Sequence, residues 1–178
     1  MKKIFLLFQF CVLCAVYGYA QVDSIVYQCD FESLSQHEDW FLNVGNQGKL
    51  CVNQWNIGAA GSNGGDYGLF VSNDGKTNNY TASKKEDAQR VVVYKELHLK
   101  AGEYEFSFDW QAAGWQDSIS DIDGLYVCWV PVSEKTNSVN ANEVMPKWSE
   151  QYALDFGRGK TKLAQSSWNT IVDTIASD

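Results

Sequence analysis

Hydrophobic and polar positions alternate along much of this chain, and alternation with a period of two predicts β-strands rather than helices. The clearest case is the run at 103–110, where every second residue from Tyr104 to Trp110 is aromatic and the residues between them are polar. Such a strand turns one aromatic face toward a core and one polar face toward solvent. Residues 89–99 are β-branched and then alternating, and the turn Ala101-Gly102 follows them, so we expect the two runs to pair as an antiparallel hairpin.

The rest of the chain repeats this pattern in shorter segments. No segment shows a convincing helical period, and Pro146 interrupts the one candidate helical turn at 142–151. Many short strands separated by polar, glycine-bearing loops predict an all-β fold, a sandwich of two packed sheets. The further strands that we expect are residues 25–31, 50–57, 67–72, 124–132 as a central strand covered on both faces, and, more weakly, 152–156 and 167–175.

The N-terminus has the layout of a secretory signal peptide. Lys2 and Lys3 precede an apolar run, and the small residues Gly18 and Ala20 place the cleavage after Ala20. The run is shorter than the roughly 20 apolar residues that a transmembrane helix needs, and an uncleaved membrane anchor is the alternative. We therefore expect residues 1–20 to be removed. Residues 21–178 would then form a single exported domain without a membrane span, located in the periplasm, at the cell surface or outside the cell.

Charge and composition narrow the classes of partner. The chain has a formal net charge of −8, and loss of Lys2 and Lys3 makes the mature chain more acidic still. This disfavours nucleic acid, whose affinity for proteins comes largely from Lys and Arg that neutralise phosphates. Aromatic residues make up 14% of the chain and include 7 Trp, more than a minimal core requires. The surplus leaves room for exposed aromatic side chains that stack on a ligand.

Three cysteines follow the signal peptide, namely Cys29, Cys51 and Cys128. An exported protein can form disulfides, and an odd number leaves at least one thiol over. Cys29 with Cys51 is the more plausible bond, since both lie near the start of the domain. Cys128 lies in an apolar run and is typical of a small buried hydrophobic residue.

The C-terminal residues 168–175 have the pattern of a strand, and the sequence stops soon after them. A sandwich needs its last strand to pair with a neighbour, because an open edge invites aggregation. Either a short final strand is enough, or this chain is the front part of a longer polypeptide with further domains. We expect the second, with the domain incomplete at its C-terminus.

Four short motifs carry a resemblance to a known family. They are Cys-Asp-Phe-Glu at 29–32, Trp55, Gly-Leu-Phe-Val-Ser at 68–72 and the aromatic run at 104–110. Together they resemble the MAM-like and cleaved-adhesin-like domains of secreted and surface proteins of Bacteroidetes-type bacteria, over residues 25–175. The resemblance implies a jelly-roll β-sandwich, concanavalin A-like or galactose-binding-like, used in adhesion. The Tyr/Phe-rich segment and the Asp-Asn-Ile-like ending usual in such domains do not follow Ile175.

The resemblance also implies a structural calcium ion. Asp30 and Glu32 flank Phe31, and residues i and i+2 of a strand share a face, so both carboxylates would point the same way. Asp123 lies in a loop that could bring a further oxygen, as do Asp66 and Asp121. Calcium takes six to eight oxygen ligands, but the spacing of a dedicated calcium loop is lacking, and solvated acidic turns are the alternative.

Three aromatic residues are poorly explained by strand alternation and are candidates for glycan binding: Trp115, Tyr80 and Trp148. Sugar-binding modules stack sugar rings on rigid aromatic side chains, here set among amide and hydroxyl groups. The alternative for each residue is a ring that folds back over the core.

Catalysis has little support in the sequence. The two histidines, His37 and His98, have no nucleophile motif beside them, and the paired Glu103 and Glu105 are typical of the polar side of an amphipathic strand. We therefore expect no enzyme, but a secreted binding or adhesion module with a glycan or an extracellular protein as its partner. The alternative is a structural or interaction domain of a larger secreted protein, without a site for a small ligand.

Overall fold

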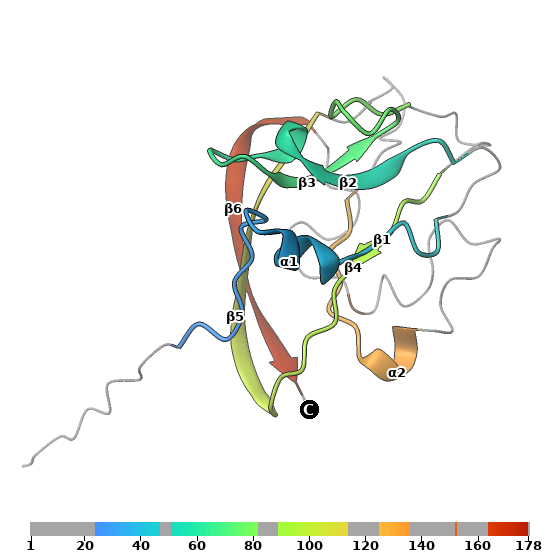
Figure 1. Ribbon diagram of the computed structural model, residues 1–178. Helices are drawn as coiled ribbons and strands as arrows, with labels where there is room; N and C mark the ends of the chain where they lie inside the picture. Colours follow the sequence, from blue (N-terminus) through green and yellow to red (C-terminus); the bar gives the residue numbers. More distant parts are fainter. Residues whose placement is uncertain are drawn as a thin grey trace, which may run out of the picture.

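The computed structural model describes residues 24–46, 51–81, 89–113, 125–135, 152 and 164–177. This part of the chain is mostly strand with a few short helices, which confirms the all-β prediction at that level. Its strands form three two-stranded antiparallel sheets, β1–β4, β2–β3 and β5–β6 (Figure 1). The elements are α1 (Leu34–Glu38), β1 (Phe41–Leu42), β2 (Gln54–Gly58), η1 (Ala59–Gly61), β3 (Gly68–Ser72), β4 (Val93–Tyr94), β5 (Gly102–Ala113), α2 (Val132–Lys135) and β6 (Ala164–Ser177).

The longest sheet is the ribbon of β5 and β6, which curves along one side of the molecule (Figure 1). Its burial alternates as the sequence predicts: the aromatic residues from Tyr104 to Trp110 are half-buried, and the polar residues between them are exposed. On β6 the inward positions include Ile171 and Ile175, which pair with Phe108 and Tyr104. The inner face of the ribbon is therefore apolar along most of its length.

The predicted hairpin of residues 89–99 with 103–110 is wrong. The partner of β5 is β6, and β4 is confined to Val93–Tyr94 and pairs with β1. Residues 95–100 form no strand. β6 is the better partner for two reasons. It pairs with β5 over nearly the whole length of β5, and it adds isoleucine side chains to the aromatic face of β5. Short sequence separation favours a pairing only when the neighbouring run offers a comparable surface.

The strands predicted at 50–57 and 67–72 are present with shorter bounds, as β2 and β3. They pair antiparallel from Gln54 opposite Ser72 to Gly58 opposite Gly68. Phe70 and Ser72 of β3 are buried, so this hairpin carries part of the core. The turn η1 packs against the start of β3.

Two further strand predictions are wrong. Residues 25–31 form no strand: Ile25 and Val26 are exposed, and Phe31 has a φ of 64°, which ends any extended run. Residues 125–131 hold only an isolated bridge at Cys128 before α2 begins. The backbone N–H of Trp129 donates to the carbonyl of Tyr152 instead, at 2.9 Å.

The remaining expectations have mixed outcomes. The strand predicted at 167–175 is present and longer, as β6. Residues 1–20 and most of 152–156 lie outside the described residues, as do Trp115, Asp121, Asp123 and Trp148. Within the residues that the structure describes, no helix is long and apolar enough to cross a membrane.

Candidate functional site

The carboxylate of Glu32 binds backbone rather than facing open solvent. It accepts hydrogen bonds from the N–H of Asp66 at 3.0 Å and from the N–H of Tyr67 at 3.1 Å. Gly65 leaves room for it, because a Cβ at that position would lie 2.1 Å from Glu32 Oε1. Asp30 accepts from the N–H of Glu32 at 3.1 Å, which forms a local turn. Both carboxylates thus have structural roles that the spacing of the motif alone does not show.

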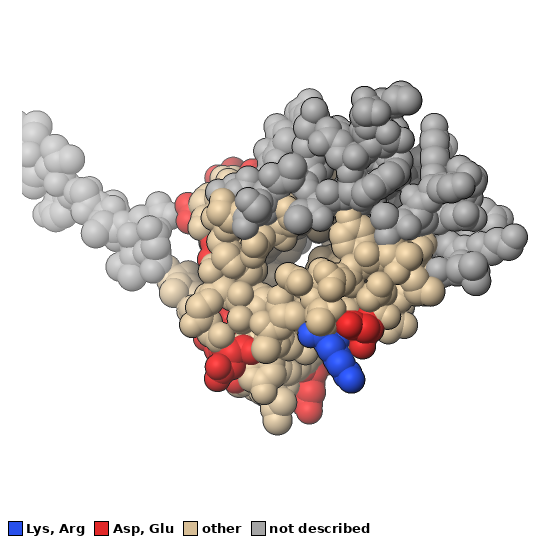
Figure 2. All heavy atoms as spheres, turned by 90° about the horizontal axis from the view of Figure 1, so that it is seen from above, with Lys and Arg blue, Asp and Glu red and all other residues tan. Residues whose placement is uncertain are grey.

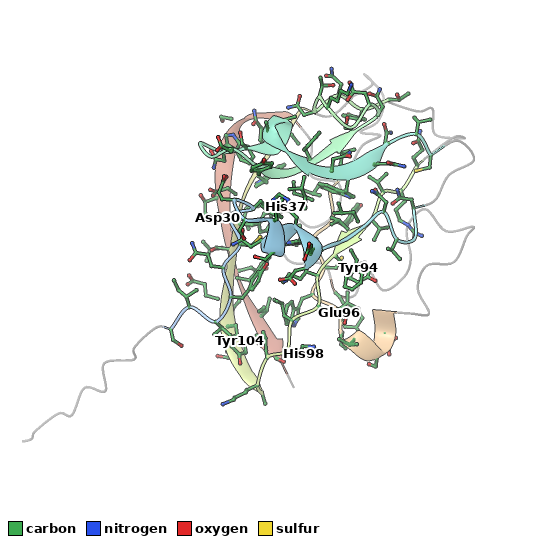
Figure 3. All side chains as sticks on the ribbon, in the orientation of Figure 1. Asp30, His37, Tyr94, Glu96, His98 and Tyr104 are labelled. Atoms are coloured by element: carbon green, nitrogen blue, oxygen red, sulfur yellow. The ribbon has the colours of Figure 1, made fainter. Side chains whose placement is uncertain are left out.

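His37 strengthens the same contact from α1 (Figure 3). Its Nε2 hydrogen-bonds with the carbonyl oxygen of Phe31, and its ring lies 5.1 Å from the ring of Tyr67. Phe31 packs on Trp40 with ring centroids 5.5 Å apart. Residues 30–40 therefore form a clamp that holds the loop at 65–67, and His37 belongs to that clamp. His98 is exposed on the run that follows β4.

The candidate metal ligands do not meet in the described ranges. No group of three or more His, Cys, Asp or Glu side chains there is placed to hold a metal ion. Asp123, which we expected to bind the ion together with Asp30 and Glu32, lies outside those ranges. The calcium site stays a prediction, and the hydrogen bonds of Glu32 account for that carboxylate without a metal.

A rigid polar loop follows β3 and leads to Tyr80. Asp74 Oδ1 accepts from the N–H of Lys76 at 2.8 Å and of Thr77 at 2.9 Å, and from the hydroxyl of Ser72 at 2.8 Å. The Asn73 N–H donates to the carbonyl of Asn79 at 2.9 Å. These bonds close the loop on itself, so its exposed polar groups are held in fixed positions.

The same bonds lower the pKa of Asp74. The N–H groups of Thr77 and Lys76, followed by the hydroxyls of Ser72 and Thr77, hold it well below its ordinary value of 3.8. A carboxylate whose pKa is lowered on folding stabilises the fold above its unfolded pKa, and the contribution is lost as pH falls. We expect the melting temperature to drop as pH decreases below about 4, with Asp74 contributing to that drop.

The matched variant is Asp74→Asn, which cannot ionise. The difference in melting temperature between wild type and D74N should be constant between pH 6 and about 5 and should shrink as pH falls from about 4 to 2. A constant difference over that range would show that the ionisation of Asp74 is not linked to folding.

Tyr80, the one described member of the three glycan candidates, is half-buried at the end of this loop. Its neighbour Thr81 is fixed by Asn53, which donates to the Thr81 carbonyl at 2.8 Å and accepts from the Thr81 N–H at 2.7 Å. Trp115 and Trp148 lie outside the described residues. The grouping of the three aromatics therefore stays a prediction.

An aromatic pair that sequence reasoning missed lies on β1 and β4. Phe41 and Tyr94 are directly opposite in register, with ring centroids 4.7 Å apart and planes inclined by 11°. Phe41 is 45% exposed, so the pair reaches the surface. Each ring has apolar neighbours in sequence, such as Leu42 and Val93, and alternation therefore gave no indication of an exposed position.

Charged groups flank this pair. Lys95 follows Tyr94, and its Nζ lies 2.8 Å from Oδ2 of Asp39. The Lys95 side chain is only 10% exposed, since the Tyr27 ring covers its ammonium group at 4.8 Å from the ring centroid. Burial, together with the neighbouring Cys29 and Asp39, raises the pKa of Tyr27. Figure 3 shows Tyr94 and Glu96 along the run from β4.

Cys29, Cys51 and Cys128 are thiols, and the predicted bond between Cys29 and Cys51 is wrong. The Cys51 thiol lies against the carbonyl oxygens of Asn53 and Arg90, at 3.7 and 3.9 Å. Burial raises the pKa of Cys51, and it raises the pKa of Cys128 to about 11. Cys128 is thus protonated at neutral pH, in keeping with its predicted role as a small packed side chain.

No family model, curated protein or solved structure matches this chain. The resemblance to MAM-like domains stays a prediction from four short motifs.

Proposed function

We propose that this chain is an exported, non-catalytic module that binds carbohydrate. The supporting observation is the stacked pair of Phe41 and Tyr94 on β1 and β4, in which Phe41 is exposed and Tyr94 is half-buried. A flat apolar ring at the surface suits the apolar face of a sugar ring, because both can lose water over a broad area without losing hydrogen bonds. The rigid two-strand setting lowers the entropy cost of ordering the rings on binding.

The polar groups near the pair suit hydroxyl groups. Asp39 pairs with Lys95, but its side chain is 60% exposed, so its carboxylate can still accept a hydrogen bond from a ligand. A sugar subsite needs a ring to stack on and a group that accepts hydrogen bonds, and we propose Asp39, two residues before Phe41 in sequence, as that acceptor. The acidic charge of the whole chain favours neutral over anionic glycans.

The test is binding to a panel of neutral and acidic polysaccharides, followed by the same measurement on Phe41→Ala. We expect one class of neutral glycan to bind, and F41A to bind it about tenfold more weakly, which corresponds to about 1.4 kcal/mol. Val132→Ala is the control, because Val132 is also an exposed apolar residue but belongs to α2 rather than to β1 or β4. Binding of no glycan by the wild type, or equal binding by F41A, would overturn the proposal.

The finer architecture that we propose is a jelly-roll sandwich. Two features of the strand pairing support it. All three pairs are antiparallel, and β1 pairs with β4 across the intervening β2–β3 hairpin. Partners that are distant in sequence are typical of Greek-key sandwiches, of which the jelly roll is one. Export through a signal peptide at 1–20 belongs to the same proposal.

A second candidate function is a domain that binds another polypeptide. The observation that favours it is on a different sheet: Val172 and Trp168 are exposed on β6. Exposed apolar residues on one sheet face are typical of protein contact surfaces when they lie together. The chemistry of that face is specific enough to carry a proposal of its own.

A further inference from the structure

The outer face of the β5–β6 ribbon bears negative charge without compensation. We define this face by its exposed residues Glu103, Glu105 and Asp109 of β5 and Trp168, Val172 and Thr174 of β6. Neither Gly102–Ala113 nor Ala164–Ser177 contains a Lys or Arg. Figure 2 shows carboxylates along the left side of the molecule, the side on which β5 and β6 lie in Figure 1.

The two glutamates of this face have no partner in the described part of the chain. The ion pair of Lys95 joins it to Asp39 and involves neither glutamate. Lys100, the nearest basic residue in sequence, forms no ion pair with Glu103 or Glu105 within those ranges. Asp109 differs, because its oxygens accept from Asn63 and Thr170. Glu103 and Glu105 therefore keep their full capacity to bind a cation.

Apolar surface lies beside these carboxylates. Val172 is 58% exposed and pairs with Ser107, so it is the diagonal neighbour of Glu105 across the two strands. Trp168 is 37% exposed on the same strand, four residues before Val172 and so about 13 Å farther along the ribbon from the glutamates. A lysine or arginine side chain suits this combination, because its methylene groups can cover apolar surface while its charge reaches a carboxylate. The Trp168 ring can also receive a cation on its face.

We propose that the outer face of β5–β6 binds a basic, extended segment of another protein. Glu103 and Glu105 are two residues apart on one strand, which separates them by about 7 Å. An extended segment with basic residues at alternate positions has the same spacing, so it can meet both carboxylates at once. A second copy of this chain is a poor occupant, since a net charge of −8 repels another. The proposal is independent of the sugar subsite, which lies on β1 and β4.

The probe is a fluorescent seven-residue peptide in which lysine and threonine alternate, added to the purified chain at low salt. We expect saturable binding that weakens as salt is raised, because the contacts are ionic and exposed. The double variant Glu103→Lys/Glu105→Lys should bind the peptide at least about tenfold more weakly, since it replaces two attractions with two repulsions. Trp168→Ala should weaken binding about threefold through loss of ring contact.

The control is Glu38→Lys/Glu134→Lys, which changes the net charge equally at two exposed carboxylates of α1 and α2. This control should bind the peptide within about twofold of wild type if position matters beyond total charge. Equal losses in the two double variants, or no binding by wild type, would overturn the proposal. Should the charge reversal prevent folding, judged by the far-ultraviolet dichroism spectrum, Glu103→Gln/Glu105→Gln replaces it, and unchanged peptide binding by that variant would also overturn the proposal.

Discussion

Alanine in place of Gly68 is expected to destabilise the fold by about 3 kcal/mol or more. A Cβ at this position would lie 1.9 Å from the carbonyl oxygen of Gly61, 2.4 Å from its carbonyl carbon and 3.0 Å from the nitrogen of Ser62. All three are backbone atoms, so no side-chain rotation can relieve the overlap. The chain must instead separate η1 from the start of β3, next to the buried Phe70.

The neighbouring Gly58 provides the control. It lies opposite Gly68 in the same hairpin, and a Cβ there would lie 3.4 Å from Cε1 of Phe70, which is ordinary contact. Gly58→Ala should therefore change the free energy of unfolding by less than about 1 kcal/mol. Urea denaturation of both variants measures the difference. Equal midpoints for G68A and G58A would mean that the approach of η1 to β3 is not part of the folded state.

The alternation of hydrophobic and polar residues predicts a strand correctly where one face of the segment is buried and the other is exposed to solvent. The run at 103–110 satisfies that condition, and β5 has the predicted aromatic face. β6 also follows its pattern, with Ile171 and Ile175 inward and Val172 outward. The pairing of β5 with β6 could not be predicted, because the alternation of hydrophobic and polar residues shows which face of a strand is buried but not which strand it pairs with.

The strand predicted at residues 25–31 is absent for a local reason. Residues 25–31 contain apolar residues at alternate positions, but Phe31 adopts a left-handed φ of 64°, and Glu32 turns to amides 34 residues later in the chain. That contact depends on Gly65 and on the position of the loop, neither of which is visible from the 29–32 motif. The same contact gives the Glu32 carboxylate of that motif a structural role as a hydrogen-bond acceptor.

The aromatic pair on β1 and β4 is positioned by polar side chains rather than by a core. Asn43 donates to the Trp55 carbonyl at 2.9 Å and accepts from the Trp55 N–H at 2.7 Å, which fastens the end of β1 to β2. Asn46 accepts from the Val92 N–H at 2.7 Å, just before β4. These amide side chains form hydrogen bonds with backbone groups of neighbouring segments, and such contacts leave no hydrophobic pattern in the sequence. The position of Phe41 could therefore not be predicted from the sequence.

Asn53→Ala is expected to lower the free energy of unfolding by about 2 kcal/mol. Asn53 is 6% exposed and bonds both backbone groups of Thr81, and its Nδ2 also donates to Gln89 Oε1 at 3.1 Å. Alanine removes all of these bonds and leaves polar groups of a partly buried site without their partner. Because 1.4 kcal/mol corresponds to a factor of ten, the Thr81 amide should exchange its hydrogen roughly 30 times faster in N53A.

Asn78→Ala, at an exposed position of the same loop, should leave both the free energy of unfolding and the exchange rate nearly unchanged. Exchange at Thr81 that is as slow in N53A as in wild type would show that the loop holds its shape without Asn53, and that its rigidity comes from the Asp74 turn.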